Sequence, residues 1–138
     1  MCVNIGYPDA TAERTLMLGA DRRVMLQTLP AVMNAEELLQ AQAGLRAIHA
    51  SVAVVDYVLA LVHATRAPGV FADGLSPRAA LALLQAARAW AALAGRDHVT
   101  PDDVQAVLLP VCAHRLHAAQ GATDSRSLLQ HMLLSIPV

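Results

Sequence analysis

The sequence contains no lysine, so its ten positively charged side chains are all arginines. The loop that cradles nucleotide phosphates in P-loop ATPases ends in a lysine followed by Ser or Thr. That loop cannot be present here, and no apolar segment ending in paired acids offers the magnesium site that such enzymes use. We therefore expect this chain by itself not to hydrolyse ATP.

Aromatic residues and cysteines are also scarce. Aromatics make up 3% of the 138 residues, whereas apolar residues make up 56%. A core built mainly from Leu, Val and Ala suits closely packed helices, and the length predicts one domain. Cys2 and Cys112 are too few for a disulfide framework, so we expect reduced thiols and a cytoplasmic location.

The charge is balanced, with 11 acids against ten arginines and a net charge of -1. Such a chain has no positive field that would attract nucleic acid. No run approaches the roughly 18 to 20 uninterrupted apolar residues that cross a bilayer, because Asp56 interrupts the best candidate, residues 52–62. The sequence therefore predicts partners other than nucleic acid or membrane.

Helix-start signals recur along the chain, where a side chain can accept hydrogen bonds from the free amides of a first turn. They predict an all-α, small helical bundle of about five to six helices. We expect Pro30 and poor periodicity to leave residues 22–32 as an irregular connection, and Pro110 to break or kink its helix. The predicted helices cover about residues 9–18, 34–49, 51–66, 76–95, 100–110 and 123–134.

Apolar spacing predicts which faces are buried. Residues 52–66 are apolar on almost every side, which favours a central helix. Two other helices carry apolar residues three or four positions apart. We expect these buried stripes to consist of Leu38, Ala41, Leu45 and Ile48 in one helix, and of Leu81, Leu84, Ala87, Ala91 and Ala94 in the other.

The helix that begins after Ser76 carries an unusual charge. Ser76 can cap the first turn, Pro77 fits the first helical position, and Gly95 can take the left-handed turn that ends the helix. Arg78 then faces the positive end of the helix dipole, which disfavours an exposed cation by about 0.3 to 1 kcal/mol. A bound anion, phosphate being the natural candidate, would reverse that sign. The alternative is that Arg78 pairs with Asp73 or extends into water.

Two further groups of residues have an ordinary and a functional interpretation. Arg66 stands at a helix end where a cation is favoured by the dipole, so it either caps the helix or contacts a subunit or nucleotide. His114 and His117 are three residues apart and could share a face, but Cys112 points elsewhere and no fourth metal ligand follows. We expect packing and surface roles for these three, and no metal site.

Several short strings occur in an order that is typical of one family. Tyr57 and residues 64–66 (Ala-Thr-Arg) come first. They are followed by residues 74–79 (Gly-Leu-Ser-Pro-Arg-Ala), 96–104 (Arg-Asp-His-Val-Thr-Pro-Asp-Asp-Val), 114–116 (His-Arg-Leu) and 136–138 (Ile-Pro-Val). Over nearly its whole length the chain resembles the C-terminal helical lid of MoxR-type AAA+ ATPases. Leu75 departs from the usual motif, which has a small residue there.

The resemblance implies a role for the chain within a larger protein. The arginine matching Arg78 would be the sensor 2 residue, which reaches the nucleotide phosphates, with Ser76 and Pro77 beside it. Residues 1–8, which include Tyr7-Pro8, would be the remnant of a preceding ATPase core, and residues 9–138 the lid. An ordinary disordered tail is the alternative for residues 1–8.

The resemblance also implies the partners of the complete protein. It would bind ATP and Mg and form a ring, a hexamer, in which the lid contacts its own AAA+ core and neighbouring subunits. It would act as a chaperone-like factor that matures or activates partner proteins, alongside a protein with a von Willebrand factor A domain. The competing hypotheses are a free-standing helical adaptor that binds a partner through residues 52–62, and the lid of a magnesium-chelatase-type ATPase.

Overall fold

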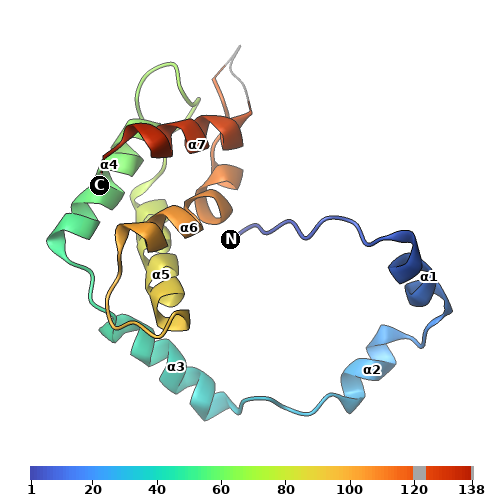
Figure 1. Cartoon of the computed structure of the whole chain (residues 1–138). Helices are drawn as coiled ribbons and strands as arrows, with labels where there is room; N and C mark the ends of the chain where they lie inside the picture. The colour runs from blue at the N-terminus through green and yellow to red at the C-terminus, as the bar shows by residue number, and fades with distance from the viewer. Residues whose placement is uncertain (120–123, 138) are drawn as a thin grey trace.

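The computed structural model describes residues 1–119 and 124–137, and within them the chain is all-α, as predicted (Figure 1). These described residues form seven α-helices and one 3-10 helix, η1, and none of these helices is long and apolar enough to span a lipid bilayer. The helices are α1 (Ala10–Leu18), α2 (Arg22–Thr28), α3 (Ala35–Ala47), α4 (Val52–Thr65), α5 (Pro77–Leu93), α6 (Pro101–Cys112), η1 (Ala113–Arg115) and α7 (Ser125–Ser135).

One prediction about helix boundaries was wrong, and in another the helix does not break at the predicted proline. Residues 22–28 form α2, because Asp21 accepts a hydrogen bond from the amide of Arg23 and so starts a helix that ends before Pro30. Pro110 lies inside α6, which continues to Cys112 before η1 begins. A proline removes only one donor, and the packed apolar face of α6 holds the helix together across that gap. The predicted start of the last helix at Thr123 lies outside the described residues, and Asp124 is its N-cap.

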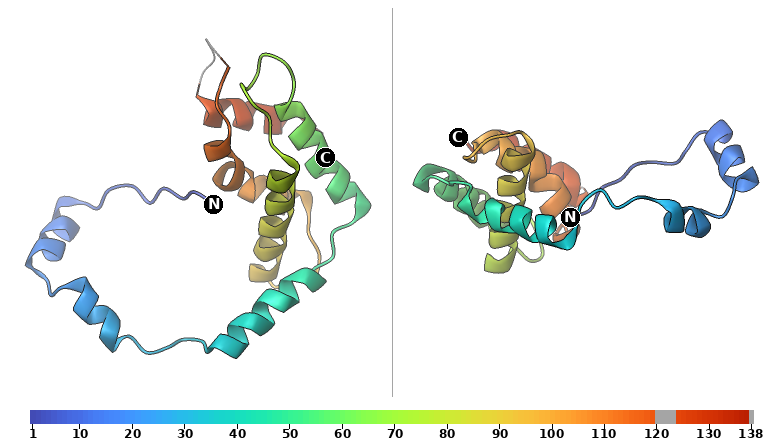
Figure 2. Two further views of the ribbon diagram at one scale, coloured as in Figure 1. Left: turned by 180° about the vertical axis from the view of Figure 1, so that it is seen from behind. Right: turned by 90° about the horizontal axis from the view of Figure 1, so that it is seen from below.

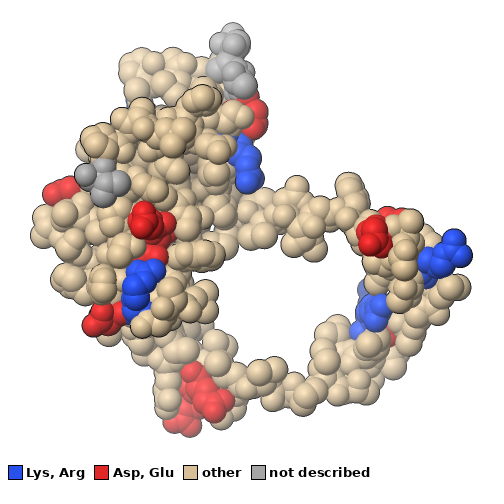
Figure 3. Space-filling model, viewed as in Figure 1, with Lys and Arg blue, Asp and Glu red and all other residues tan. Residues whose placement is uncertain are grey.

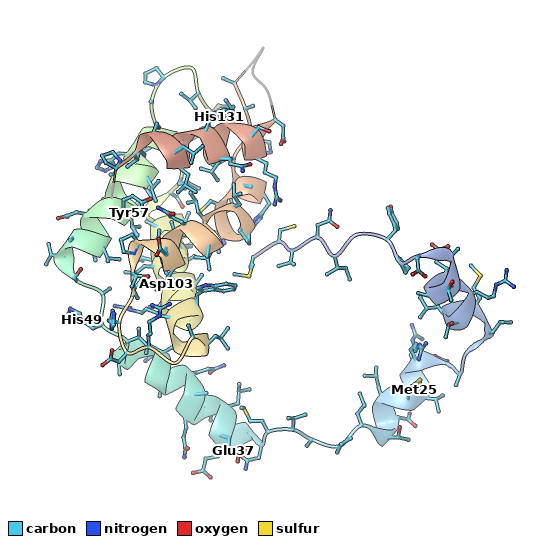
Figure 4. The ribbon with its side chains drawn as sticks, viewed as in Figure 1. Met25, Glu37, His49, Tyr57, Asp103 and His131 are labelled. Atoms are coloured by element: carbon cyan, nitrogen blue, oxygen red, sulfur yellow. The ribbon has the colours of Figure 1, made fainter. Side chains whose placement is uncertain are left out.

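The chain divides into a packed part and an extended part (Figures 1 and 2). Residues 48–119 and 124–137 form what we call the bundle, which contains the buried core. Residues 1–47, which we call the arm, leave the bundle beside α6, run through α1 and α2, and return along α3. All arm residues except Leu45 are exposed, on both sides of the predicted boundary at residue 8. Figure 4 shows Tyr57 and Asp103 within the bundle and Met25 and Glu37 on the arm.

The core is formed by α4, α5, α6 and α7, and α5 packs most extensively against α6. Helix α4 packs against the other three, but its Val52 and Leu59 remain exposed, so it is not enclosed on every side. In α5 the predicted Ala87 and Ala91 are buried and Leu84 is half-buried, but Leu81 and Ala94 are exposed. The buried row in α5 is Ala79, Leu83, Ala87 and Ala91. Because α5 is apolar on more than one face, its periodicity does not fix which face turns inward.

The stripe predicted for α3 is buried only at one end. Leu45 and Ile48 are half-buried, whereas Leu38 and Ala41 are exposed. The start of α3 is nevertheless well defined, because Asn34 and Glu37 form reciprocal capping hydrogen bonds of 2.9 and 2.7 Å. The helix contacts α5 through its C-terminal part only, so the rest of its apolar face has no neighbour within the described residues.

Two short backbone pairings join the connections of the bundle to one another. His49 donates to the carbonyl of Asp97 and accepts from the amide of Val99, both at 2.8 Å. At the other end, the amide of Ala72 donates to the carbonyl of His117 at 2.8 Å, beside the antiparallel pairing of Phe71 with Ala118. The connection 96–99 is therefore extended, and the loop after α4 is held against the segment after η1.

A buried ion pair fixes the turn from α5 into α6. Arg96 donates to the two carboxylate oxygens of Asp103 at 2.7 and 2.5 Å. The amide and the hydroxyl of Thr100 donate to the same carboxylate at 2.8 and 2.9 Å. Asp103 is 2% exposed, so these donors replace the water that its carboxylate loses on folding. The guanidinium of Arg96 and the Thr100 donors lower the pKa of Asp103 to about 2.

We expect Asp103→Asn to lower the free energy of unfolding by about 2 kcal/mol, because it removes a buried charged acceptor and leaves Arg96 without its partner. The loss should be constant above about pH 4 and should shrink as pH falls toward 2, because a lowered pKa stabilises the fold only while the carboxylate is ionised. Urea unfolding at several pH values measures both effects. Asp102→Asn, at the exposed neighbouring position, is the control, and equal losses in the two variants would contradict this account.

Candidate functional site

The sequence-predicted site residue Arg78 lies at the second position of α5 and is exposed. Within the described residues, no hydrogen bond joins its guanidinium to another group, and no ion pair joins it to Asp73. The Arg78 side chain therefore extends into solvent and does not pair with Asp73. The side chain is not enclosed by the bundle, and an anion can approach it from solvent.

The first turn of α5 leaves one amide free next to that side chain. Ser76 is the N-cap, and its hydroxyl accepts from the amide of Ala79 at 3.3 Å. The carbonyl of Ser76 accepts from Ala79 and Ala80 at 2.9 and 3.1 Å, and Pro77 has no amide hydrogen. Of the first-turn donors that the structure describes, the amide of Arg78 is left without a partner. Guanidinium, amide and helix dipole thus belong to the same turn and all favour an anion.

The loop before α5 is anchored to the end of α4. The buried hydroxyl of Thr65 accepts from the amide of Leu75 at 3.0 Å and donates to the carbonyl of Val62 at 2.6 Å. Arg66 Nε donates to the carbonyl of Leu75 at 2.9 Å, so both backbone groups of Leu75 are held. The position of Ser76 and Arg78 relative to α4 is therefore set by two hydrogen bonds to Leu75, and the bond to Val62 fixes the Thr65 hydroxyl on α4.

Gly74 brings the loop and the helix end into contact. A Cβ atom at position 74 would lie 2.8 Å from the Cα of Arg66, closer than real side chains come. Leu75, the departure from the usual family motif, is 2% exposed and fills the core. Its size is accommodated inside the bundle and does not alter the exposed turn that follows.

An apolar groove of about 360 Å³ lies beside this turn, between α4 and α5. Arg66 and Pro77 line it at the end where Arg78 stands, and Leu81 lines it further along α5. Arg66 is the C-cap of α4, as the structural alternative predicted, while its side chain makes an unpredicted bond to Leu75 and lines the groove near the α5 turn. The groove was not predicted, because Leu81 was expected to be buried. The remaining lining residues are Val55, Val58, Leu59, Val62, Ala80 and Leu84.

The other polar groups of the bundle do not join this site. Tyr57 is buried, and its hydroxyl accepts from Gln105 at 3.0 Å, which ties α4 to α6. Burial raises the pKa of the Cys112 thiol to about 11, while His114 and His117 are exposed. Within the described residues, no three His, Cys, Asp or Glu side chains are arranged to hold a metal ion. The buried Nε of Arg88, which sequence reasoning did not single out, has no hydrogen-bond partner there.

A family model described as the AAA lid domain matches residues 63–131, half of the chain. Chaperone MoxR1 of Mycobacterium tuberculosis is 36% identical over 125 residues, covering 83% of this chain and 32% of that protein. The uncharacterized protein YeaC of Bacillus subtilis is 30% identical over 114 residues, covering 83% of this chain and 36% of that protein. Protein MoxR of Paracoccus denitrificans is 38% identical over 99 residues, covering 62% of this chain and 29% of that protein.

The crystal structure of a "putative ATPase" from Cytophaga hutchinsonii has the same fold, with a TM-score of 0.78 and 23% identity, over 96% of this chain and 44% of that one. The chain thus spans about a third of the length of the curated relatives it matches. Its helical bundle, its family match and its relatives together show that the chain belongs to the AAA lid domain family, in the MoxR-type group.

Proposed function

We propose that this chain is the lid of a MoxR-type AAA+ ATPase and that Arg78 is its sensor 2 arginine. The observation that carries the proposal is the exposed first turn of α5, where the guanidinium and the backbone amide of Arg78 have no partner among the described residues. The match to the AAA lid domain family supports it. The MoxR relative also supports it, because it is about three times as long as this chain and so has room for an ATPase core.

The residues of this turn fit a phosphate group. A guanidinium forms charge-assisted hydrogen bonds to phosphate oxygens, and the amide of Arg78 and the helix dipole add to the attraction. The turn offers no carboxylate for Mg, so the metal would be held by the ATPase core that this chain lacks. ATP and Mg therefore belong to the full-length protein, and the nucleotide supplies the phosphoryl group that is transferred.

Arg78 would act in two ways in that protein. Its charge offsets the negative charge that spreads over the γ-phosphate oxygens in the transition state. Its contact also makes the lid angle depend on the nucleotide, because α5 is fixed to α4 through Thr65, Arg66 and Leu75. Ser76 and Pro77 set the geometry of the turn, and Arg78 is the residue that touches the phosphate.

The proposed protein acts as a ring, a hexamer in the cytoplasm, in which the lid meets its own AAA+ core and the neighbouring subunits. In this proposal ATP turnover drives chaperone-like maturation or activation of a partner, together with a von Willebrand factor A domain protein. The name of the relative Chaperone MoxR1 is in keeping with such a role.

A free-standing helical adaptor is the second candidate function. The apolar groove between α4 and α5 favours it, because Val55, Val58 and Val62 fall within residues 52–62, the segment expected to bind a partner. The genomic reading frame separates the two candidates. Phosphate-loop and magnesium-site motifs upstream in the same frame support the lid, and a start codon at Met1 supports the adaptor.

In the full-length protein, Arg78→Ala should reduce ATP turnover at least about tenfold, because it removes a charge that acts in the transition state. Steady-state phosphate release measures this, and thermal unfolding should show an unchanged fold. Arg126→Ala, an exposed arginine of α7 in the bundle, is the matched control. Unchanged turnover in Arg78→Ala would remove the sensor 2 assignment.

The isolated chain should bind ATP weakly or not at all, because one turn of one helix supplies only a fraction of the contacts that hold a triphosphate. Isothermal titration calorimetry with ATP in the presence of Mg measures this. Submicromolar affinity would show that this chain carries a complete nucleotide site and would contradict the proposal.

Thr65→Val should lower the free energy of unfolding by about 1 to 3 kcal/mol, because it leaves the buried amide of Leu75 unpaired. Thr65→Ser keeps the hydroxyl and should lose less. Hydrogen exchange at the Leu75 amide reports the bond directly. In the full-length protein the valine variant should also lower ATP turnover, with recovery in the serine variant, since Thr65 positions the Arg78 turn.

A further inference from the structure

The chain exposes far more surface than its mass requires. Its accessible area is 9783 Å², whereas a compact protein of 14.6 kDa exposes about 6,900 Å² by the usual scaling with mass. The excess is about 2,900 Å² on this chain alone, enough for its share of a permanent interface, because such interfaces bury roughly 2,000 to 5,000 Å² counted over both partners. The bundle has a buried core of its own, so the excess belongs to the arm.

The arm is folded but contributes no buried residue. Its helices α1, α2 and α3 contain 9, 7 and 13 residues, and each starts at a capping side chain. Helices of this length are marginal in water without tertiary contacts. Their defined caps and their unburied apolar faces therefore point to a surface that is completed by another polypeptide.

The exposed side chains of the arm are large and apolar over its whole length. Ile5 is 95% exposed, Met17 83% and Val32 99%. Single exposed apolar residues are ordinary, but a series that recurs on three capped helices and on the connections between them marks an interaction surface. On the helices the series includes Leu16, Leu18, Val24, Leu26, Leu38 and Leu39.

The beginning of the arm lies against the bundle. The amide of Cys2 donates to the carbonyl of Pro110 at 2.7 Å, so a polypeptide preceding residue 1 would enter beside α6. Figure 3 shows an opening between the arm and the bundle on this face, and the arm forms its rim. A domain attached at that point would meet the arm directly.

We propose that the arm is a docking surface for the part of the same polypeptide that precedes it, the ATPase core, and that the self-standing lid begins near Ile48. This rests on the proposed function. The curated relatives supply a polypeptide of the required size, since this chain covers 36% and 32% of two of them. A covalently attached domain also acts at millimolar effective concentration, which favours it over a second free copy.

The test places a charge on the arm of the full-length protein. Met17→Glu in α1 and Leu26→Glu in α2 should each lower its melting temperature by at least about 4 °C, because docking would bury the new carboxylate. Leu93→Glu in the bundle, 84% exposed, is the matched control and should shift it by less than about 1 °C. In the isolated 138-residue chain all three variants should melt like the parent, because these positions face solvent there.

Hydrogen exchange gives an independent readout. Amides of α1 and α2 should exchange slowly in the full-length protein and at least about tenfold faster in the isolated chain, where nothing covers the arm. If both arm variants behave like Leu93→Glu in the full-length protein, or if the arm amides stay unprotected there, the inference is wrong. A discrete dimer of the isolated chain in sedimentation velocity, dissociated by Met17→Glu, would assign the arm to a second copy and would also overturn it.

These outcomes are separable from the test of Arg78. If the arm variants leave the melting temperature unchanged while Arg78→Ala loses turnover tenfold, the docking arm is rejected and the sensor 2 assignment stands. If the arm variants lower the melting temperature while Arg78→Ala keeps normal turnover, the sensor 2 assignment is rejected and the docking arm stands. A genomic reading frame that encodes no ATPase core upstream of this chain would reject both the docking arm and the sensor 2 assignment.

Discussion

The buried carboxylate of Asp103 fixes the turn from α5 into α6. It accepts from Arg96 and from the amide and hydroxyl of Thr100, so four donor atoms converge on one buried group. Burying an ion is costly unless its hydrogen bonds are replaced, and here each lost water has a substitute. Because α5 and α6 form the largest packing surface, this turn fixes the orientation of the helix that carries Arg78.

Local rules predicted much of this fold. Four predicted helices begin at residues 9, 34, 51 and 76, and in the structure these residues are N-caps whose side chains accept from nearby amides. Such a bond spans only three residues, so a sequence displays it directly. The exposure of Arg78 follows from the same geometry, because a first-turn side chain after Pro77 has little to pack against. The family resemblance was confirmed by the family match and the relatives.

Features that depend on distant residues were not predicted. The inward face of α5 is set by its alanines against α6, and a helix apolar on several sides does not reveal that choice, so Leu81 was misplaced. The Arg96–Asp103 pair closes over seven residues, and Thr65 meets Leu75 over ten. The stripe of α3 failed for another reason: its pattern is that of a buried helix, but only its end at Leu45 and Ile48 meets the bundle within the described residues.

The two backbone pairings between connections have a mechanical consequence. Connections usually absorb strain, yet here residues 48–51 are tied to 96–99, and 70–72 to 117–119. Neither end of the four-helix unit can then flex on its own. Because His49 joins the entry of α3 to the connection that follows α5, a rotation of α3 would act on the end of α5 opposite the one that carries Arg78. Figure 4 labels His49 at this junction.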